Sequence, residues 1–371
     1  MSCNTETHHA DCIIVGGGAS GLLAARELAL AGLKVTLLER GETGREASWA
    51  GGGIVSPLYP WRAETAVTRL ALWSQEHYDA LADELITSTG VDPEYTPGGM
   101  LYLDSDETAT ALAWGEHWQR KVAALAPAQA HEIAPCLAPP ATAALWLPYV
   151  HQVRNPRLAR ALRASAEHLG VELHEHCEVH GLIVREGRAG GVRTAQGRFE
   201  APRVIIAGGA WSGELLRGLP WAPAIAPVRG QMILFRSEPG RLPCVVMRGP
   251  HYLIPRRDGR IVCGSTLEFT GFDKSTTAAA RDELYAAALE LMPQLAECPL
   301  EAHWAGLRPG APSGIPYIGE HPAIGGLFIN AGHYRNGLTI GPASARLLAD
   351  LLLGREPILD PQPYAFRAER L

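Results

Sequence analysis

The segment from Asp11 to Arg40 constrains the fold of this chain more than any other. Cys12–Val15 is a short apolar run that predicts a buried strand, and GGGASG follows it directly. The next residues, LLAARELALAG, repeat apolar side chains at helical spacing and stop at Gly32, a natural helix terminator. A second apolar run, KVTLLE, ends in Glu39. The order strand, glycine turn, helix, strand and acid predicts a dinucleotide-binding βαβ unit.

The glycines and the acid of this unit each have a physical role at a dinucleotide. Gly16 permits the sharp turn, Gly18 lets backbone amides approach a pyrophosphate, and Gly21 lets the helix pack closely on the strand. The helix N-terminus attracts the phosphate charge. Glu39 is expected to accept hydrogen bonds from an adenosine ribose, where its negative charge disfavours a further phosphate. These features leave nicotinamide and flavin dinucleotides both open.

Two further small-residue clusters favour the flavin. Gly51, Gly52 and Gly53 follow in the loop after Glu39, where a simple nicotinamide enzyme needs no second glycine cluster. An apolar strand later in the chain closes on AGGAW, residues 207–211. Small residues at such points let the backbone pass close to a buried cofactor. The sequence therefore predicts FAD rather than NAD.

Length and charge narrow the remaining classes. A chain of 371 residues fits two domains, possibly interleaved. A formal net charge of −6 without a basic block argues against nucleic acid or an anionic membrane as a partner. No apolar run approaches the roughly 18 residues needed to span a bilayer, and the N-terminus lacks a secretory pattern. Seven scattered cysteines without a C-x-x-C pair are typical of reduced thiols, so we expect a cytoplasmic protein.

The ordered series of motifs resembles a known family. CIIVGGGASG, REASWAGGG, IIAGGAWSG, HYLIPRRDGRIVCGST, WAGLRPG and GHYRNG occur in this order and run nearly end to end. The series is similar to the D-amino-acid oxidase superfamily of FAD enzymes, and within it to the glycine oxidases of thiamine biosynthesis. The resemblance implies a Rossmann-like FAD domain of the glutathione-reductase type with an interleaved α+β substrate domain on a mixed or antiparallel sheet.

The resemblance also implies which residues contact the cofactor. Ala19 and Ser20 are expected at the pyrophosphate, Glu39 and Arg40 at the adenosine, and Val179 against the adenine. The residues expected to line the flavin are Ala47, Ser48, Gly52, Gly53 and Ile54. The residues expected at its pyrimidine edge are His333, Tyr334, Arg335, Asn336, Gly337, Leu338 and Thr339, in a loop before a helix that begins near Pro342. Amides at a helix start stabilise negative charge on a reduced flavin.

Two arginines follow apolar runs near the C-terminal end of the chain. Arg308 lies in AGLRPG and Arg335 in AGHYRNG. A guanidinium grips a carboxylate through two parallel hydrogen bonds, and glycine offers little else to recognise. In the resembling family the matching arginines contact the substrate carboxylate, and Tyr252 matches a tyrosine that binds the carboxylate or orients the amine. The alternative is that both arginines pair with acids on neighbouring strands.

Other polar features are discounted as sites. His174, His176 and His180 alternate with Cys177 among them, but a solvated strand face accounts for them better than a metal does. The pair His8–His9 is assigned to a frayed terminus. We therefore expect no metal. APSGIPYIGEH stands where covalent flavoproteins of the family carry an attachment cysteine, so FAD is expected to bind noncovalently.

We expect the FAD-binding domain to comprise residues 8–90, 148–222 and 302–371, and the substrate domain residues 91–147 and 223–301. The expected function is oxidative deamination of glycine and small amines such as sarcosine and D-alanine, with glyoxylate or a 2-oxo acid, ammonia and hydrogen peroxide as products. Hydride passes to the flavin without a protein acid or base, and oxygen is the acceptor. A homotetramer follows from the resemblance. The alternatives are an FAD-dependent D-amino-acid dehydrogenase serving a quinone or partner protein, and a non-catalytic flavin-binding protein.

Overall fold

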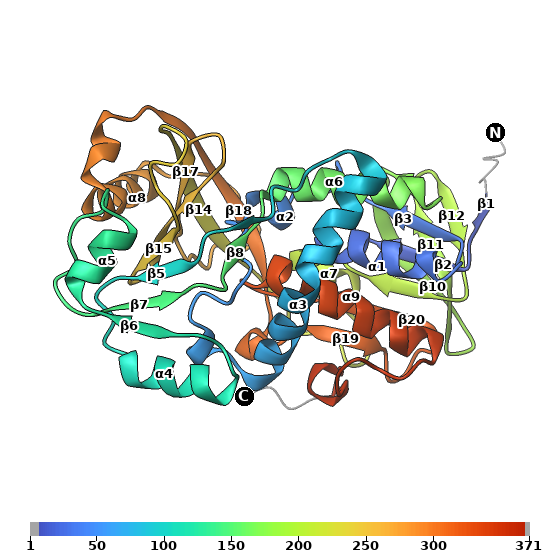
Figure 1. The fold of residues 1–371 in the computed structure, drawn as a ribbon. Helices are drawn as coiled ribbons and strands as arrows, with labels where there is room; N and C mark the ends of the chain where they lie inside the picture. The colour runs from blue at the N-terminus through green and yellow to red at the C-terminus, as the bar shows by residue number, and fades with distance from the viewer. Residues whose placement is uncertain (1–6, 368–371) are drawn as a thin grey trace.

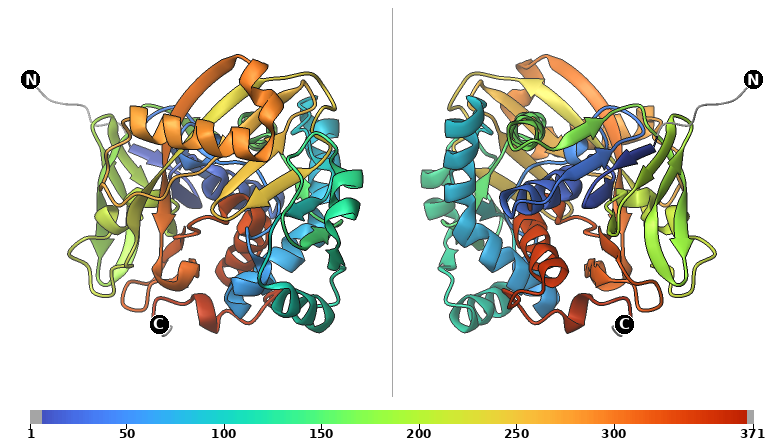
Figure 2. Two further views of the ribbon diagram at one scale, coloured as in Figure 1. Left: turned by 90° about the vertical axis from the view of Figure 1, so that its left-hand side faces the viewer. Right: turned by 90° about the vertical axis from the view of Figure 1, so that its right-hand side faces the viewer.

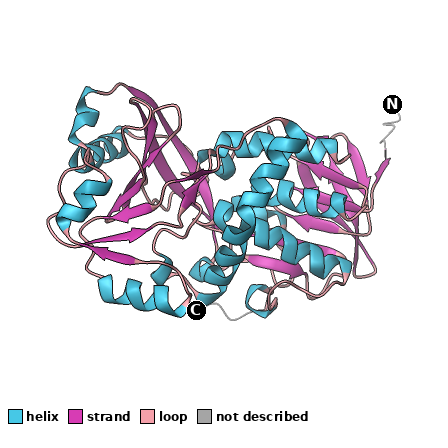
Figure 3. Cartoon of the chain, viewed as in Figure 1, coloured by secondary structure: helices cyan, strands magenta, loops and turns pink. Residues whose placement is uncertain are grey.

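The computed structural model describes residues 7–367, which form two large sheets at opposite ends of the molecule with helices packed between and around them (Figure 1). Helices and strands are interleaved along the chain, as the mixed α/β prediction requires (Figure 3). Within residues 7–367, no helix combines the length and apolar character needed to cross a bilayer.

A six-stranded sheet contains the predicted βαβ unit. Its order is β19-β20-β13-β2-β3-β9, and all neighbours are parallel except β19 and β20. The strands are β2 (Cys12–Val15), β3 (Val35–Leu38), β9 (Glu172–His174), β13 (Val204–Ile206), β19 (Tyr317–Glu320) and β20 (Leu327–Ala331). Every residue of β2 and β3 is buried, which explains why these strands read as continuous apolar runs.

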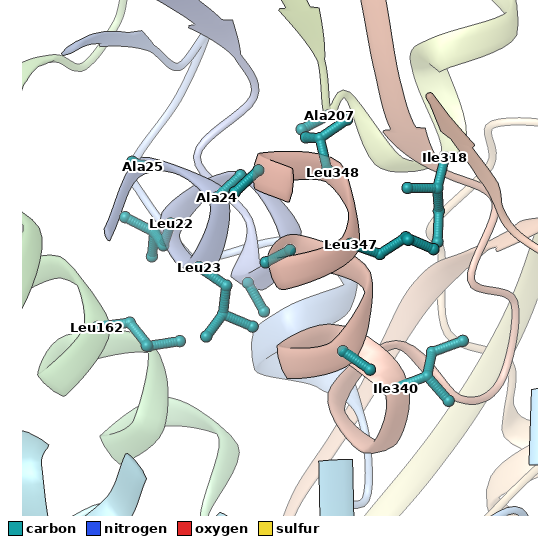
Figure 4. Packing of buried hydrophobic residues seen from close by; sticks show 14 of the residues in the cluster. Leu22, Leu23, Ala24, Ala25, Leu162, Ala207, Ile318, Ile340, Leu347 and Leu348 are labelled. Atoms are coloured by element: carbon teal, nitrogen blue, oxygen red, sulfur yellow. The ribbon is translucent and has the colours of Figure 1, made fainter. Parts of the chain in front are cut away.

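Four helices pack together on one face of this sheet. They are α1 (Ala19–Leu30), α3 (Thr65–Thr89), α6 (Asn155–His168) and α9 (Gly337–Leu353). Leu22 and Leu23 of α1 and Leu347 and Leu348 of α9 belong to one hydrophobic cluster, in which Leu347 extends toward Ile318 of β19 (Figure 4). The short side chain of Ala24 lies between the two helices, and Gly341 of α9 has no side chain where Leu23 approaches, so the helices pack closely. This packing fixes the N-termini of α1 and α9 relative to the sheet.

The start of α9 differs from the expected position. The helix begins at Gly337 and not near Pro342, which lies inside it. Proline lacks an N–H, so the carbonyl of Leu338 loses its helical partner. That carbonyl instead accepts a hydrogen bond from Tyr78 Oη at 2.9 Å, and the next amide, Ala343, donates to Ser74 Oγ at 3.0 Å. Side chains of α3 thus satisfy the backbone groups that Pro342 leaves without helical partners. A rule based on the local sequence around the proline misses this tertiary effect.

A four-stranded sheet covers the other face of the parallel sheet, at the outer edge of the molecule (Figure 2). Its strands are β1 (Thr7–His9), β10 (Val179–Arg185), β11 (Arg188–Thr194) and β12 (Gly197–Glu200). The assignment of His8–His9 to a frayed terminus was wrong, because β1 pairs with β12 and the His8 ring stacks on Phe199. His174 closes β9, whereas His180 belongs to β10, so the alternating histidines share no strand.

An eight-stranded sheet forms the opposite end of the molecule. Its order is β18-β14-β17-β16-β15-β5-β7-β6, antiparallel except for the pair β15 and β5. The strands are β5 (Met100–Tyr102), β6 (Ala123–Leu125), β7 (Ala144–Leu147), β14 (Ala226–Arg236), β15 (Val245–Arg248), β16 (His251–Pro255), β17 (Arg260–Gly264) and β18 (Leu300–Gly310). The predicted mixed or antiparallel second sheet is confirmed.

Smaller elements complete the fold. Helix α8 (Ala278–Leu291) packs across β14, β16 and β17, as Figure 2 shows. The other helices are α2 (Ala47–Ala50), α4 (Thr108–His117), α5 (Pro127–Ile133) and α7 (Ser212–Leu215). A two-stranded ribbon joins β4 (Thr96–Pro97) to β8 (His151–Gln152), and 3₁₀ turns span Pro60–Arg62, Gly209–Trp211, Pro293–Glu297, Pro312–Gly314 and Gln362–Tyr364.

Candidate active site

A cavity of about 740 Å³ lies between the six-stranded and the eight-stranded sheets. Its lining includes almost every residue that the sequence singled out for cofactor or substrate: Gly16, Gly18, Ala19, Ser20, Glu39, Arg40, Ala47, Ser48, Gly52, Gly53, Ile54, Val179, Tyr252, Arg308, His333, Tyr334, Arg335, Gly337, Leu338 and Thr339. Asn336 instead lines a neighbouring cavity of about 620 Å³. The tertiary fold therefore brings together residues that are scattered over more than 300 positions of the sequence.

The glycine turn has the close packing that its sequence predicts. Gly16 has φ +113°, and a Cβ there would lie 2.4 Å from the carbonyl oxygen of Ala207. A Cβ on Gly21 would lie 1.9 Å from the carbonyl oxygen of Gly16. These contacts are shorter than any side chain tolerates, so the turn depends on both glycines. The backbone consequently curls tightly over the N-terminus of α1.

Glu39, directly after β3, holds the glycine turn through hydrogen bonds. Its carboxylate accepts hydrogen bonds from the backbone N–H of Gly17 at 2.7 Å and of Gly41 at 2.9 Å, and the residue is 9% exposed. The acid thus fixes the glycine loop and lines the cavity at once. Beside it, the Arg40 guanidinium lies 3.6 Å over the ring of Trp211, and its Nη2 donates to Glu46 at 3.1 Å. A nucleoside at this end of the cavity would meet an acid, a guanidinium and an aromatic face.

Two residues that sequence reasoning missed hold the second glycine loop. Asn155 Nδ2 donates to the carbonyl of Ser48 at 3.0 Å. Arg256 is buried and donates to the carbonyls of Gly52 at 2.7 Å and Val153 at 2.9 Å, and burial lowers its pKa to about 10. Asn155 stands in no motif named above, and Arg256 lies within HYLIPRRDGRIVCGST without a role that the motif itself reveals, because both residues act across the tertiary fold. They hold the loop backbone against the cavity.

Arg308 lies on β18, deep between the two sheets, and faces the cavity. Its Nη1 donates to the carbonyls of Arg229 at 3.3 Å and Thr266 at 3.1 Å, and its Nη2 donates to Ser265 Oγ at 2.8 Å. Among residues 7–367 this guanidinium forms no ion pair, so the alternative of internal pairing does not hold for it. Burial lowers the pKa of Arg308 from its usual range. A deep guanidinium without a counterion favours an anionic ligand.

The second arginine occupies a different position. Arg335 is exposed and lines both the main cavity and the neighbouring one, as Tyr334 does. Tyr334 has φ +48°, and its N–H donates to the carbonyl of Pro309 at 2.9 Å. No acid of the described chain forms an ion pair with Arg335 either. The two residues therefore lie between the two cavities.

Tyr252 and Met232 form a close-fitting wall beside Arg308. A Cβ on Gly264 would lie 2.9 Å from Tyr252 Oη and 2.8 Å from the terminal methyl of Met232. A Cβ on Gly52 would lie 3.4 Å from both side chains. The phenol also opposes the lowering of the Arg308 pKa. Both side chains pack against the glycine backbone at positions 52 and 264 and line the cavity together with Arg308.

The N-terminus of α9 faces the same cavity. Gly337, Leu338 and Thr339 line it with the first amides of the helix, and Thr339 Oγ1 donates to the carbonyl of Ile54 at 3.0 Å. His333 lies beside them, with Nδ1 at 3.3 Å from Ser20 Oγ. Burial lowers the pKa of His333 to about 4, so its ring is neutral near neutral pH. Positive potential here comes from helix amides and not from an imidazolium.

The residues present fit a bound dinucleotide. Any Cβ at Gly16 or Gly21 would collide with the backbone of the glycine turn, and the N-cap of α1, Gly18, has no side chain. The Ala19 N–H at the start of α1 donates to Ser48 Oγ at 2.8 Å, so Ser48 holds the second glycine loop beside this turn. His333 Nε2 and both side-chain polar atoms of Asn330 are buried at the cavity and have no hydrogen-bond partner among residues 7–367. Such a cradle at the carboxyl ends of parallel strands, open to a deep guanidinium, defines a dinucleotide-dependent oxidoreductase.

Comparison with known proteins identifies the family within this class of oxidoreductases. Residues 11–351 match the family described as FAD dependent oxidoreductase. A glycine oxidase of Pseudomonas aeruginosa is 53% identical over 354 residues, covering 95% of this chain and 97% of that protein. The crystal structure of glycine oxidase from Geobacillus kaustophilus has a TM-score of 0.92 and 32% identity, covering 98% of this chain and 99% of that one.

A third relative carries an additional region. The bifunctional protein ThiO/ThiG of Trichormus variabilis is 35% identical over 364 residues, which cover 96% of this chain and 55% of that protein. The chain belongs to the FAD dependent oxidoreductase family, and FAD is its cofactor. The resemblance drawn from the motifs is confirmed.

The FAD is expected to be released when the protein unfolds. Cys177 lines the cavity, but burial raises the pKa of its thiol, so it is poorly suited to attack a flavin. Denaturing the yellow protein with acid or heat should leave the colour in the supernatant, measured by absorbance after centrifugation. Colour that stays with the precipitated polypeptide would show a covalent link.

Proposed function

We propose that this protein is a glycine oxidase that also accepts small amines such as sarcosine and D-alanine. From glycine the products are glyoxylate, ammonia and hydrogen peroxide. The observation that carries the proposal is the Arg308 guanidinium, which lies deep in the FAD cavity and forms no ion pair with an acid among residues 7–367. The Pseudomonas aeruginosa protein that is 53% identical to this chain is named glycine oxidase, which supports the proposal.

Substrate recognition rests on charge and size. The Arg308 guanidinium binds the carboxylate, with Arg335 and the Tyr252 phenol as its neighbours in the cavity. The wall of Tyr252 and Met232, packed against the glycine backbone at positions 52 and 264, excludes long side chains. A ligand that consists of little more than a carboxylate, one carbon and an amine satisfies these limits.

The same guanidinium also affects the protonation state of the substrate amine. A nearby positive charge disfavours the ammonium form, so Arg308 shifts a bound amino acid toward the neutral amine. Bound FAD would supply the acceptor for hydride from the α-carbon and the route by which the electrons reach oxygen. The protein holds the α-carbon in place and excludes bulkier donors. No protein group is assigned as general acid or base.

A peroxide-coupled substrate screen tests this function. Glycine, sarcosine and D-alanine should release hydrogen peroxide in buffer without an added acceptor, while bulky L-amino acids give little. If a long-chain L-amino acid is the best substrate, the size argument fails. If flavin is reduced under anaerobic conditions but needs an artificial dye to turn over in air, the protein is a dehydrogenase. If no amine reduces the flavin, catalysis itself is ruled out.

The cellular setting is part of the same proposal. A relative named ThiO/ThiG supports a role in supplying the glycine imine for the thiazole of thiamine. We place the protein in the cytoplasm as a homotetramer, with oxygen as acceptor. We also retain the division into an FAD-binding domain (8–90, 148–222, 302–371) and a substrate domain (91–147, 223–301). Gel filtration with light scattering tests the oligomer.

A further inference from the structure

The Arg308 guanidinium rests in a closely fitted seat, which we define as Gly230, Ser265 and the carbonyls of Arg229 and Thr266. Gly230 lies on β14, which pairs with β18, the strand that carries Arg308. A Cβ at Gly230 would lie 2.2 Å from both Nη atoms of Arg308 and 2.3 Å from its Cζ. The guanidinium therefore occupies the space that any other residue at position 230 would fill.

The seat uses only part of the hydrogen-bonding capacity of Arg308. A guanidinium has five N–H groups. Nη1 donates to two carbonyls and Nη2 donates to Ser265 Oγ, so three N–H groups are satisfied by the protein. The Nε–H and the second N–H of Nη2 face no backbone carbonyl or serine of the seat, and the Tyr252 phenol lies beside the guanidinium on the cavity side. A carboxylate needs two adjacent donors of this kind for a two-pronged contact.

The seat is itself held rigidly. The Arg229 guanidinium, which points away from Arg308, pairs with Glu268 at 2.6 Å and with Asp273 at 2.5 Å. Backbone hydrogen bonds join Arg229 and Glu268 in both directions, at 2.9 and 3.0 Å. Thr266 Oγ1 accepts from the Gln231 N–H at 2.9 Å and donates to Glu268 at 2.6 Å. The two segments that contribute the carbonyls are therefore locked together.

We infer that Ser265 and Gly230 are positioning residues that orient the Arg308 guanidinium, so that its two remaining N–H groups face the substrate carboxylate. Ser265 is 5% exposed and lines the FAD cavity, so its hydroxyl bonds Arg308 at the cavity wall. Gly230 provides the space and Ser265 fixes the rotation. The role of the carboxylate rests on the proposed function, whereas the seat itself is a property of the fold.

Binding of acetate to the FAD-loaded protein tests this role without turnover. Acetate presents only a carboxylate, and its binding is followed by the change in flavin absorbance. Ser265→Ala removes one hydrogen bond to a charged group and should weaken acetate binding about 5- to 20-fold. Gly230→Ala should weaken it more, because it displaces the guanidinium. Oxidation of ethylamine, which lacks a carboxylate, should change by less than about twofold in Ser265→Ala.

A double-mutant cycle separates positioning from a general structural effect. In an Arg308→Ala background, Ser265→Ala should cause no further loss of acetate affinity, because the group on which it acts is gone. Ser265→Thr keeps the hydroxyl and should recover most of the affinity. Two matched controls are Ser88→Ala, at an exposed position of α3 where the hydroxyl donates only to the carbonyl of Glu84, and Gly190→Ala in β11, where a Cβ would meet nothing closer than 3.6 Å. Both variants should bind acetate normally.

The outcomes distinguish the seat from the proposed function. Equal losses from Ser265→Ala with and without Arg308 would overturn the positioning role, as would unchanged acetate affinity in Ser265→Ala. A protein that loses acetate binding as expected, yet oxidises no amine, would leave the seat intact and overturn the oxidase. If Gly230→Ala does not retain FAD, the Ser265 variants decide the inference alone.

Discussion

Replacing Arg308 with alanine is expected to lower kcat/KM for glycine by about 30- to several-thousand-fold, because a desolvated charge pair of this kind is worth roughly 2–5 kcal/mol. The guanidinium lies deep in the FAD cavity without an acidic partner, so the substrate carboxylate is its natural counterion. Steady-state kinetics on glycine, with flavin occupancy measured by absorbance, provide the test.

The controls for this variant exploit the geometry of the contact. Ethylamine never bonds Arg308, so its oxidation should fall far less than that of glycine. Arg308→Lys should recover only part of the activity, because an ammonium cannot make the two-pronged contact. Arg281→Ala, which removes an exposed arginine paired with Asp282, should have little effect. Equal losses on glycine and ethylamine, or a protein without FAD, would show that Arg308 supports the fold and that the carboxylate is held elsewhere.

The N-terminal half of the cofactor site could be predicted because its signals are local. The buried strand Cys12–Val15 lies where its apolar run indicates, and Gly16 and Gly21 have the close contacts that their spacing predicts. A βαβ unit can be recognised from the sequence because its buried strands and its helical periodicity all lie within about thirty residues.

The surroundings of Arg308 could not be predicted in the same way. Its position at the end of an apolar strand indicated a functional arginine, but Gly230 and Ser265 lie 78 and 43 residues away from it in sequence. They meet Arg308 only because β14 pairs with β18 and the end of β17 closes over both. A serine after a strand and a glycine within one carry no chemical signature. Only the folded sheet shows that they share one guanidinium.

Local rules also failed where distant elements compensate for them. Pro342 suggested a helix start, yet α9 continues through it because Tyr78 and Ser74 of α3 satisfy the interrupted hydrogen bonds. His8 suggested a disordered end, yet Phe199 and the pairing of β1 with β12 order it. In both cases the missing partner comes from more than 180 residues away. These errors follow from long-range packing and not from misread propensities.

Gly21→Ala is expected to weaken FAD binding by at least about 100-fold. The new Cβ would lie 1.9 Å from the carbonyl oxygen of Gly16, and a backbone atom in a turn this tight cannot move aside. Overpacking costs about 3 kcal/mol or more when backbone must shift, and each 1.4 kcal/mol is a tenfold change in affinity. The strain falls on the turn that receives the pyrophosphate. Gly98→Ala is the control, because the nearest atom to its Cβ is 3.5 Å away.

Reconstitution of the apoprotein with FAD, followed by quenching of flavin fluorescence, measures the affinity of both variants. Circular dichroism shows whether Gly21→Ala still folds, and Gly98→Ala should bind FAD like the parent protein. A folded Gly21→Ala variant with unchanged FAD affinity would mean that α1 can retreat from the glycine turn without disturbing the phosphate site. The close approach of Leu23 to Gly341 of α9 argues against such a retreat, because moving α1 would open the buried cluster that the two helices share (Figure 4).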